Sequence, residues 1–122
     1  MAEGNININM FITSGELAEN NGTWNCAKFD SGLMIQWGKR IGVNFNNQVG
    51  YGGNFSLPVT YKSGSQVIAF ISCDQSDSNN YVFRCGATAS TTIFSFSLVS
   101  GTNSAITISN RSFNWMTIGY WK

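Results

Sequence analysis

The last ten residues of the chain, 113–122, constrain its fold more than any other segment, because they predict one aromatic-rich β-strand that runs to the terminus. Successive side chains of a strand point to opposite faces of its sheet. One face of this strand would carry Trp115, Thr117 and Gly119, and the opposite face would carry Met116, Ile118 and Tyr120. Large apolar residues lie on both faces, so both should be covered. We therefore expect the end of the chain to belong to the core rather than to form a tail.

The same period of two runs through most of the chain, and no window of eleven residues shows a convincing helical stripe. The clearest example is residues 92–99, where Phe94, Phe96 and Leu98 would face inward while serines alternate with them. Turn-rich segments separate nine predicted strands, at residues 23–29, 33–38, 41–45, 54–57, 66–73, 81–88, 92–99, 105–109 and 113–121. Many short strands at this spacing predict an all-β fold, either an antiparallel β-sandwich or a barrel.

The composition indicates one folded domain with few charges. Charged residues make up 11% of the 122 positions, against about a quarter in ordinary soluble proteins. Nine Phe, four Trp and four Tyr supply the apolar area that a disordered chain lacks. Residues 1–22 differ in kind, because a short alternating run is followed there by polar and glycine-containing stretches. We expect residues 1–22 to be a connector and residues 23–122 to be the folded domain.

Several partners and cofactors are disfavoured by the same composition. A net charge of +1 does not suit nucleic acid, and no apolar run approaches the roughly twenty residues of a membrane-spanning helix. The chain has no His, and its three cysteines do not have the spacing of a zinc site. Residues 74–79 begin like a calcium loop but lack its distal glutamate. We expect no membrane insertion, metal or other cofactor.

The three cysteines, Cys26, Cys73 and Cys85, allow two interpretations. They are either buried free thiols, or Cys73 and Cys85 form a cross-strand disulfide. The second interpretation rests on their equal distance along the chain from Asn79, in the loop that both would flank.

Three segments resemble the C-terminal domain family of phage tail fibres, which lies at fibre tips of tailed phages, prophages and phage-tail-like bacteriocins. Trp115, Gly119 and Tyr120 match its closing Trp-x-Ala-x-Gly-Tyr, with Thr117 in place of the alanine. Residues 21–24 with 32–38 are similar to its first strand and its Gly-Leu-Ile-Ile-Gln-Trp-Gly motif. Residues 55–61 are similar to its Phe-Pro-x-x-Phe stretch, with one extra residue between Phe55 and Pro58. Together these segments cover residues 21–122 in the order of the family.

This resemblance implies a homotrimer of sandwiches, similar in shape to the H-type lectins, at the tip of a virion tail fibre. It also implies binding to a bacterial cell-surface polysaccharide such as lipopolysaccharide, teichoic acid or capsule. Three linked sites would raise the avidity for a weak glycan ligand. We expect the four tryptophans to lie in the core or in a subunit interface.

An up-and-down chain would place its turns alternately at two ends of the domain. Counted from residue 23, the end far from the fibre shaft would receive residues 30–32, 46–53, 74–80 and 100–104. The near end would receive residues 39–40, 58–65, 89–90 and 110–112. On this count the far end holds every Asp of the chain and the near end holds Lys39, Arg40, Lys62 and Arg111. Because the far loops are the longer ones, we expect ligand contacts there.

Seven far-end residues are candidates for glycan binding. Tyr51 and Tyr81 would stack on the apolar face of a sugar. Hydrogen bonds to hydroxyl groups would come from Asn47, Asp74, Asp77, Asn79 and Asn80. Asn and Asp are also ordinary turn residues, so a purely structural role stays open for each of them.

The leading hypothesis is a fibre tip that binds a bacterial glycan and so mediates host adsorption. One alternative is a structural cap that ends and trimerises the fibre without touching the receptor. The other is a glycan-degrading depolymerase, which the sequence disfavours. A serine or cysteine triad would need His, and the only nearby pair of carboxylates, Asp74 and Asp77, lies on one loop. We therefore expect no enzyme.

Overall fold

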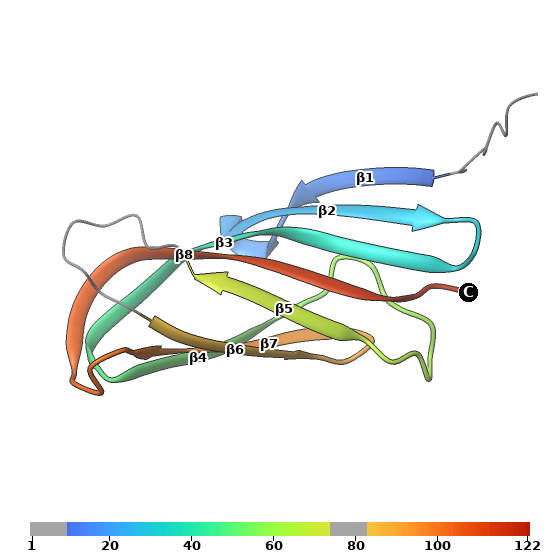
Figure 1. Cartoon of the computed structure of the whole chain (residues 1–122). Helices are drawn as coiled ribbons and strands as arrows, with labels where there is room; N and C mark the ends of the chain where they lie inside the picture. Colours follow the sequence, from blue (N-terminus) through green and yellow to red (C-terminus); the bar gives the residue numbers. More distant parts are fainter. Residues whose placement is uncertain (1–9, 74–82) are drawn as a thin grey trace, which may run out of the picture.

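The computed structural model describes residues 10–73 and 83–122, which form two packed antiparallel sheets (Figure 1). One sheet has five strands in the order β1-β2-β3-β8-β5, and the other has three in the order β4-β7-β6. The strands are β1 (Met10–Glu16), β2 (Gly22–Phe29), β3 (Leu33–Gln48), β4 (Gly50–Ser56), β5 (Ile68–Cys73), β6 (Phe83–Ala89), β7 (Ile93–Ser100) and β8 (Ile106–Tyr120), and a short 3-10 turn, η1 (Ala18–Asn20), precedes β2. The predicted all-β antiparallel sandwich is confirmed.

An aromatic core fills the space between the two sheets. Phe94, Phe96 and Leu98 of β7 are all buried, as their alternation predicts. The ring centroids of Phe96 and Phe113 lie 4.6 Å apart, and those of Phe55 and Trp115 lie 5.1 Å apart. The end of the chain is therefore central to the core, because Phe113 and Trp115 both belong to β8.

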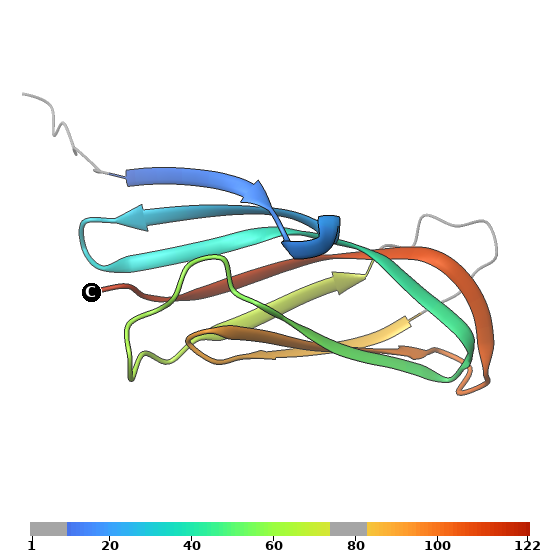
Figure 2. The same cartoon turned by 180° about the vertical axis from the view of Figure 1, so that it is seen from behind.

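β3 and β8 are single long strands, and this corrects the predicted turns at residues 39–40 and 110–112. The two strands pair from Leu33↔Tyr120 to Gln48↔Ile106, with register shifts between Arg40 and Gln48. Gly42 and Asn110 have positive φ angles of 73° and 59° near these shifts. Such positions bend a ladder as β-bulges without reversing it. Figures 1 and 2 show both strands curving away from the five-stranded layer toward the three-stranded one.

The loss of these two reversals changes which loops share an end. One end, here called the C-terminal end, gathers the β2–β3 turn, residues 57–67, the β6–β7 turn and the chain terminus (Figure 2). There the Trp121 N–H donates to the Gly32 carbonyl at 2.9 Å, and the Lys62 N–H donates to the Tyr120 carbonyl at 2.8 Å. The opposite end carries the β3–β4 and β7–β8 turns. Residues 30–32 thus lie at the end opposite to residues 46–53 and 100–104, whereas the prediction placed all three at one end.

Part of the expected connector is joined to the sheet. Residues 10–16 form β1, which pairs with β2 along its whole length from Met10↔Phe29 to Glu16↔Thr23. Leu17, directly after β1, is 5% exposed and belongs to the core cluster. A boundary of the receptor-binding domain at residue 22 stays a prediction.

Candidate functional site

Two of the seven predicted ligand residues are described, and both make contacts within the domain. The Tyr51 ring is half-buried and lies 6.1 Å from the rings of both Phe45 and Phe96. Asn47 has a φ of 52°, and its N–H donates to the Thr107 hydroxyl at 2.9 Å. These contacts give Tyr51 a packing role and Asn47 a turn role, and their contact with a ligand stays a prediction. The other five, Asp74, Asp77, Asn79, Asn80 and Tyr81, lie outside the described residues.

The predicted separation of charge between the two ends does not hold. Lys39, Arg40 and Arg111 lie within β3 and β8 rather than in turns of one end. Asp30, expected at the far end, lies in the β2–β3 turn at the C-terminal end, where Lys62 and Lys122 also lie. Arg84 of β6 donates a hydrogen bond to the Asn103 side chain at the opposite end.

The residues of the Gly-Leu-Met-Ile-Gln-Trp-Gly stretch, 32–38, tie β3 to its neighbours. The Gln36 side chain is fully buried and makes two hydrogen bonds to the backbone of Val59, donating at 2.8 Å and accepting at 3.1 Å. A Cβ atom added to Gly38 would lie 1.9 Å from the Thr23 carbonyl oxygen. Glycine at this position therefore permits the close approach of β2 to β3.

The closing residues of β8 complete the same block. The Thr117 hydroxyl lies 2.7 Å from the Tyr61 hydroxyl, inside the core. A Cβ on Gly119 would lie 2.8 Å from the Tyr61 ring, so the glycine leaves room for that ring. Tyr120 points to the other side of the sheet and is 53% exposed. Three residues of the closing motif thus serve the core, and its tyrosine lies on the outer surface.

Much of that outer surface of the five-stranded sheet is apolar, although no segment within residues 10–73 and 83–122 covers it. One row of paired residues crosses all five strands without a polar side chain: Ile12, Ala27, Ile35, Ile118 and Ile68. Ile12 is 59% exposed and Ile68 is 57% exposed. In the next row Trp37 and Phe70, which are 36% and 47% exposed, flank Met116.

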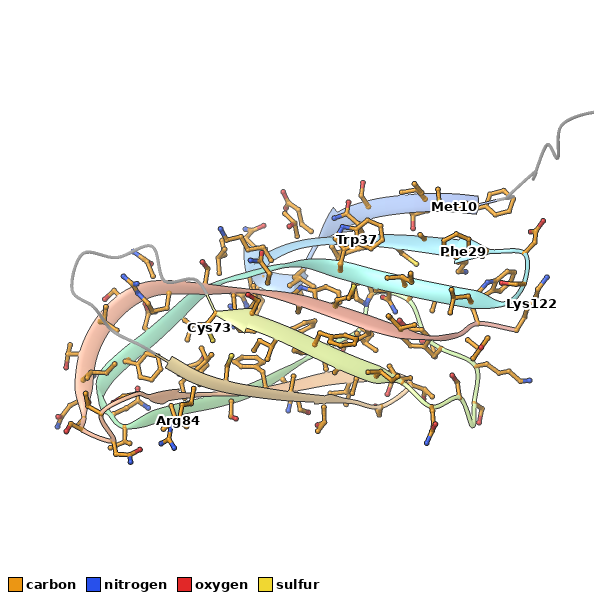
Figure 3. All side chains as sticks on the ribbon, in the orientation of Figure 1. Met10, Phe29, Trp37, Cys73, Arg84 and Lys122 are labelled. Atoms are coloured by element: carbon orange, nitrogen blue, oxygen red, sulfur yellow. The ribbon has the colours of Figure 1, made fainter. Side chains whose placement is uncertain are left out.

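We call this surface the apolar face, and we include in it Met10, Phe29, Leu33 and Tyr120 beside the all-apolar row. Figure 3 shows Met10, Phe29 and Trp37 on β1, β2 and β3, away from the three-stranded sheet that carries Arg84. An antiparallel sheet with one face in water normally alternates apolar-in and polar-out. Contiguous exposed apolar surface of this kind marks an interaction site.

The three cysteines are free thiols, as in the first of the two interpretations, but they differ in burial. Cys26 is buried, Cys73 is half-buried and Cys85 is exposed. Burial, together with the neighbouring Cys85 thiol, raises the pKa of Cys73 to about 12. Burial also raises the pKa of Cys26. Cys73 and Cys85 are thus neighbouring free thiols without a disulfide between them.

Residues 10–73 and 83–122 contain no helix that is long and apolar enough to cross a membrane. They also contain no group of three His, Cys, Asp or Glu side chains placed to hold a metal ion.

Comparison with known proteins assigns the two-sheet fold and its motifs to a class, the C-terminal domains of tail fibres. The family described as "Putative tail fiber protein gp53-like, C-terminal" matches residues 28–120, and the chain belongs to this family. No curated protein matches the chain.

Two solved structures share the fold, and both are pyocin fibres. The N-truncated R1-type pyocin tail fibre is 16% identical, with a TM-score of 0.57 over 90% of this chain and 86% of that chain. The R1 pyocin fibre of P. aeruginosa comprising C-terminal residues 323–701 is also 16% identical, with a TM-score of 0.53 over 90% of this chain and 28% of that chain. The chain is therefore a tail-fibre domain of a phage or a phage-tail-like particle.

Proposed function

We propose that this domain is the receptor-binding tip of its fibre, that it assembles as a homotrimer, and that it attaches to a bacterial surface polysaccharide. The apolar face carries the proposal, because it gives a fibre domain a large surface suited to its own copies. The side chains of Ile12, Ile68 and Phe70 are about half exposed, so covering each would contribute roughly half of the about 1.5–3 kcal/mol of a full burial. Closed rotational symmetry is the usual arrangement of identical subunits, and three copies would present three equivalent receptor sites.

The mass of the domain in solution tests the assembly. Light scattering should give about three times the chain mass of 13.4 kDa. Replacing an apolar-face residue by a charge, as in Ile68→Lys or Phe70→Glu, should yield folded monomers. Ile93→Lys is the matched control, because Ile93 is 41% exposed but lies on the three-stranded sheet. A monomeric wild-type domain, or trimers that survive both apolar-face substitutions, would contradict the assembly.

Cell binding tests the receptor role and separates it from the two alternatives. The fluorescently labelled domain should stain some strains in a panel of bacteria, and purified surface polysaccharide from a stained strain should compete. A structural cap would leave every strain unstained, including strains that the parent particle infects or kills. A depolymerase would shorten the purified polysaccharide during incubation, and we expect its chain length to stay unchanged.

The family membership and the fibre neighbours support the receptor role, and so does the position of the β3–β4 and β7–β8 turns at the end away from Met10. If the fibre shaft joins the domain at the side where β1 begins, these turns lie at the outer end of the fibre. Loops on a rigid scaffold commonly carry binding residues. The proposed glycan contacts are Asn47 and Tyr51 beside the β3–β4 turn, together with the predicted residues Asp74, Asp77, Asn79, Asn80 and Tyr81.

A further inference from the structure

A small polar cavity of about 270 Å³ lies on the flank of the sandwich, separate from both the apolar face and the loops at the ends. Three elements line it: η1, β3 through Arg40, and the strand β4. β4 is an edge strand of the three-stranded sheet, so its free side offers backbone groups that no partner strand occupies.

The η1 side of the cavity is held by defined contacts. The Leu17 N–H donates to the Gly22 carbonyl at 2.8 Å, which closes the turn around η1. The Ile41 N–H donates to the Asn21 carbonyl at 2.9 Å, which fastens the turn to β3. Leu17 itself is 5% exposed and anchors the segment in the core. The walls of the cavity are thus fixed by the fold.

The chain reverses between β1 and β2 through a tight turn with two consecutive residues in the left-handed region. Glu19 and Asn20 have φ angles of 61° and 57°, in the left-handed region that suits glycine. Asparagine adopts this conformation readily, whereas the glutamate does so at a cost on the order of 1 kcal/mol. The turn places the exposed glutamate Glu19 at the mouth of the polar cavity.

The lining groups match the hydroxyl groups of a sugar. Glu19 accepts hydrogen bonds, whereas the amides of Asn21 and Asn54 both donate and accept them. Arg40 donates one N–H to the Ile41 carbonyl, and the remaining donors of its guanidinium fork extend the set. Phe55 contributes an apolar wall. Ligand cavities for drug-sized molecules have about 300–1,000 Å³, so this cavity suits one sugar unit rather than several.

We propose that the cavity between η1, Arg40 and β4 binds a single hydroxyl-rich sugar unit of the receptor polysaccharide. This assignment rests on the proposed glycan binding and gives it a site that the loop residues do not include. Glu19 and Arg40 orient the sugar through charge-assisted hydrogen bonds. The side-chain amides of Asn21 and Asn54 form hydrogen bonds with its remaining hydroxyl groups.

A titration of the ¹⁵N-labelled domain with free monosaccharides tests the site. Glucose, galactose, rhamnose and N-acetylglucosamine, each up to about 50 mM, form the panel, and L-alanine tests whether a zwitterion binds instead. At least one sugar should shift the amides of residues 19–21, 40–41 and 54–56 with a Kd on the order of 1 mM. Arg40→Gln should raise that Kd at least about tenfold, because a charge-assisted bond is lost. Lys62→Gln, at the C-terminal end, should leave it unchanged.

A second variant guards against loss of fold in Arg40→Gln. Ser56→Tyr fills the cavity from an exposed position of β4 and leaves the core contacts in place, so it should abolish the titration while the spectrum stays dispersed. The site is refuted if no sugar saturates, if the shifts lie elsewhere, if L-alanine binds more tightly, or if Ser56→Tyr titrates like the wild type.

Cell staining separates this inference from the proposed function. Wild-type staining that Arg40→Gln and Ser56→Tyr both retain would overturn the cavity and leave the receptor role intact. A wild-type domain that stains no strain but binds a sugar in the cavity would overturn the receptor role alone.

Discussion

Tyr61 and Thr117 share a hydrogen bond inside the core, and it gives a prediction at the scale of single residues. Tyr61 is 2% exposed and Thr117 is fully buried, so water is not available as an alternative hydrogen-bond partner for either hydroxyl. Tyr61→Phe or Thr117→Val alone leaves one buried hydroxyl without this partner and should lower the free energy of unfolding by about 1–3 kcal/mol.

The double variant should cost clearly less than the sum of the two single variants, because it leaves no orphaned hydroxyl. Urea unfolding of the four proteins measures this coupling. Simple additivity would mean that the two hydroxyls do not depend on each other.

The thiols and the tyrosine of the core give a prediction for alkaline pH. Burial raises the pKa of Cys73 to about 12, and it also raises the pKa values of Cys26 and Tyr61. The folded chain therefore keeps these protons at pH values where the unfolded chain loses them, at its ordinary pKa values of about 8.5–10. Their contribution to stability is complete below about pH 8.5 and falls as the pH rises toward 12.

Urea midpoints at pH 8, 9.5 and 11 measure this fall. Cys73→Ser removes the most strongly shifted thiol and should flatten it. A wild-type midpoint that stays constant up to pH 11 would show that these groups ionise equally in both states.

Local alternation predicts the orientation of some side chains but not the packing partners of others. The inward positions of Phe94, Phe96 and Leu98 followed from strict alternation with serine along β7. Tyr51 is predicted as a ligand residue because it lies in the Asn- and Gly-rich segment 46–53, which is predicted to be a far-end loop, and its contact with a ligand stays a prediction. Its position beside Phe45 and Phe96 depends on other strands, which no local pattern contains.

At the scale of strands, polar residues in the middle of a long strand resembled turns. Lys39-Arg40 and Asn110-Arg111-Ser112 are both predicted to reverse the chain, yet both lie within the β3–β8 ladder, where Arg40 pairs with Phe113 and Arg111 pairs with Val43. Two bulges near each other on paired strands bend both without ending either. The sequence of one strand cannot indicate this, because the partner that continues the ladder is about seventy positions away.

The tight contact between β2 and β3 gives a prediction at this scale. Gly38→Ala would place a Cβ atom 1.9 Å from the Thr23 carbonyl oxygen, so the two strands would have to separate. We expect a loss of at least about 2 kcal/mol in the free energy of unfolding.

Gly86→Ala is the matched control on β6, because its Cβ would meet nothing closer than the Ser97 hydroxyl at 3.8 Å. It should be neutral or stabilising by up to about 1 kcal/mol, since alanine restricts the unfolded chain. Thermal unfolding compares the two variants. Equal effects would show that the β2–β3 approach is not tight.

At the scale of the whole molecule, the final strand holds the five-stranded sheet together. β8 lies between β3 and β5, and it is the only partner of β5 in that sheet among the described strands. Ending the chain at residue 112 would remove Phe113 and Trp115 from the core and leave β5 unpaired. We expect this variant to lose cooperative thermal unfolding and assembly together.

Removal of Lys122 alone is the control, and it should keep both properties. Circular dichroism and light scattering measure the outcome. A truncated chain that still melts cooperatively would show that the remaining strands form a core without β8.

The position of the two ends of the described chain has a practical consequence. β1 begins beside the end of β2, and Trp121 is bonded to the β2–β3 turn, so both ends lie at one pole of the sandwich. A short peptide could join them, and new termini could be opened in the β7–β8 turn without cutting a strand. In such a circular permutant the termini lie at the opposite pole, so a carrier fused to them would hold the domain in the reversed orientation. The choice between the two forms would determine which pole faces a cell.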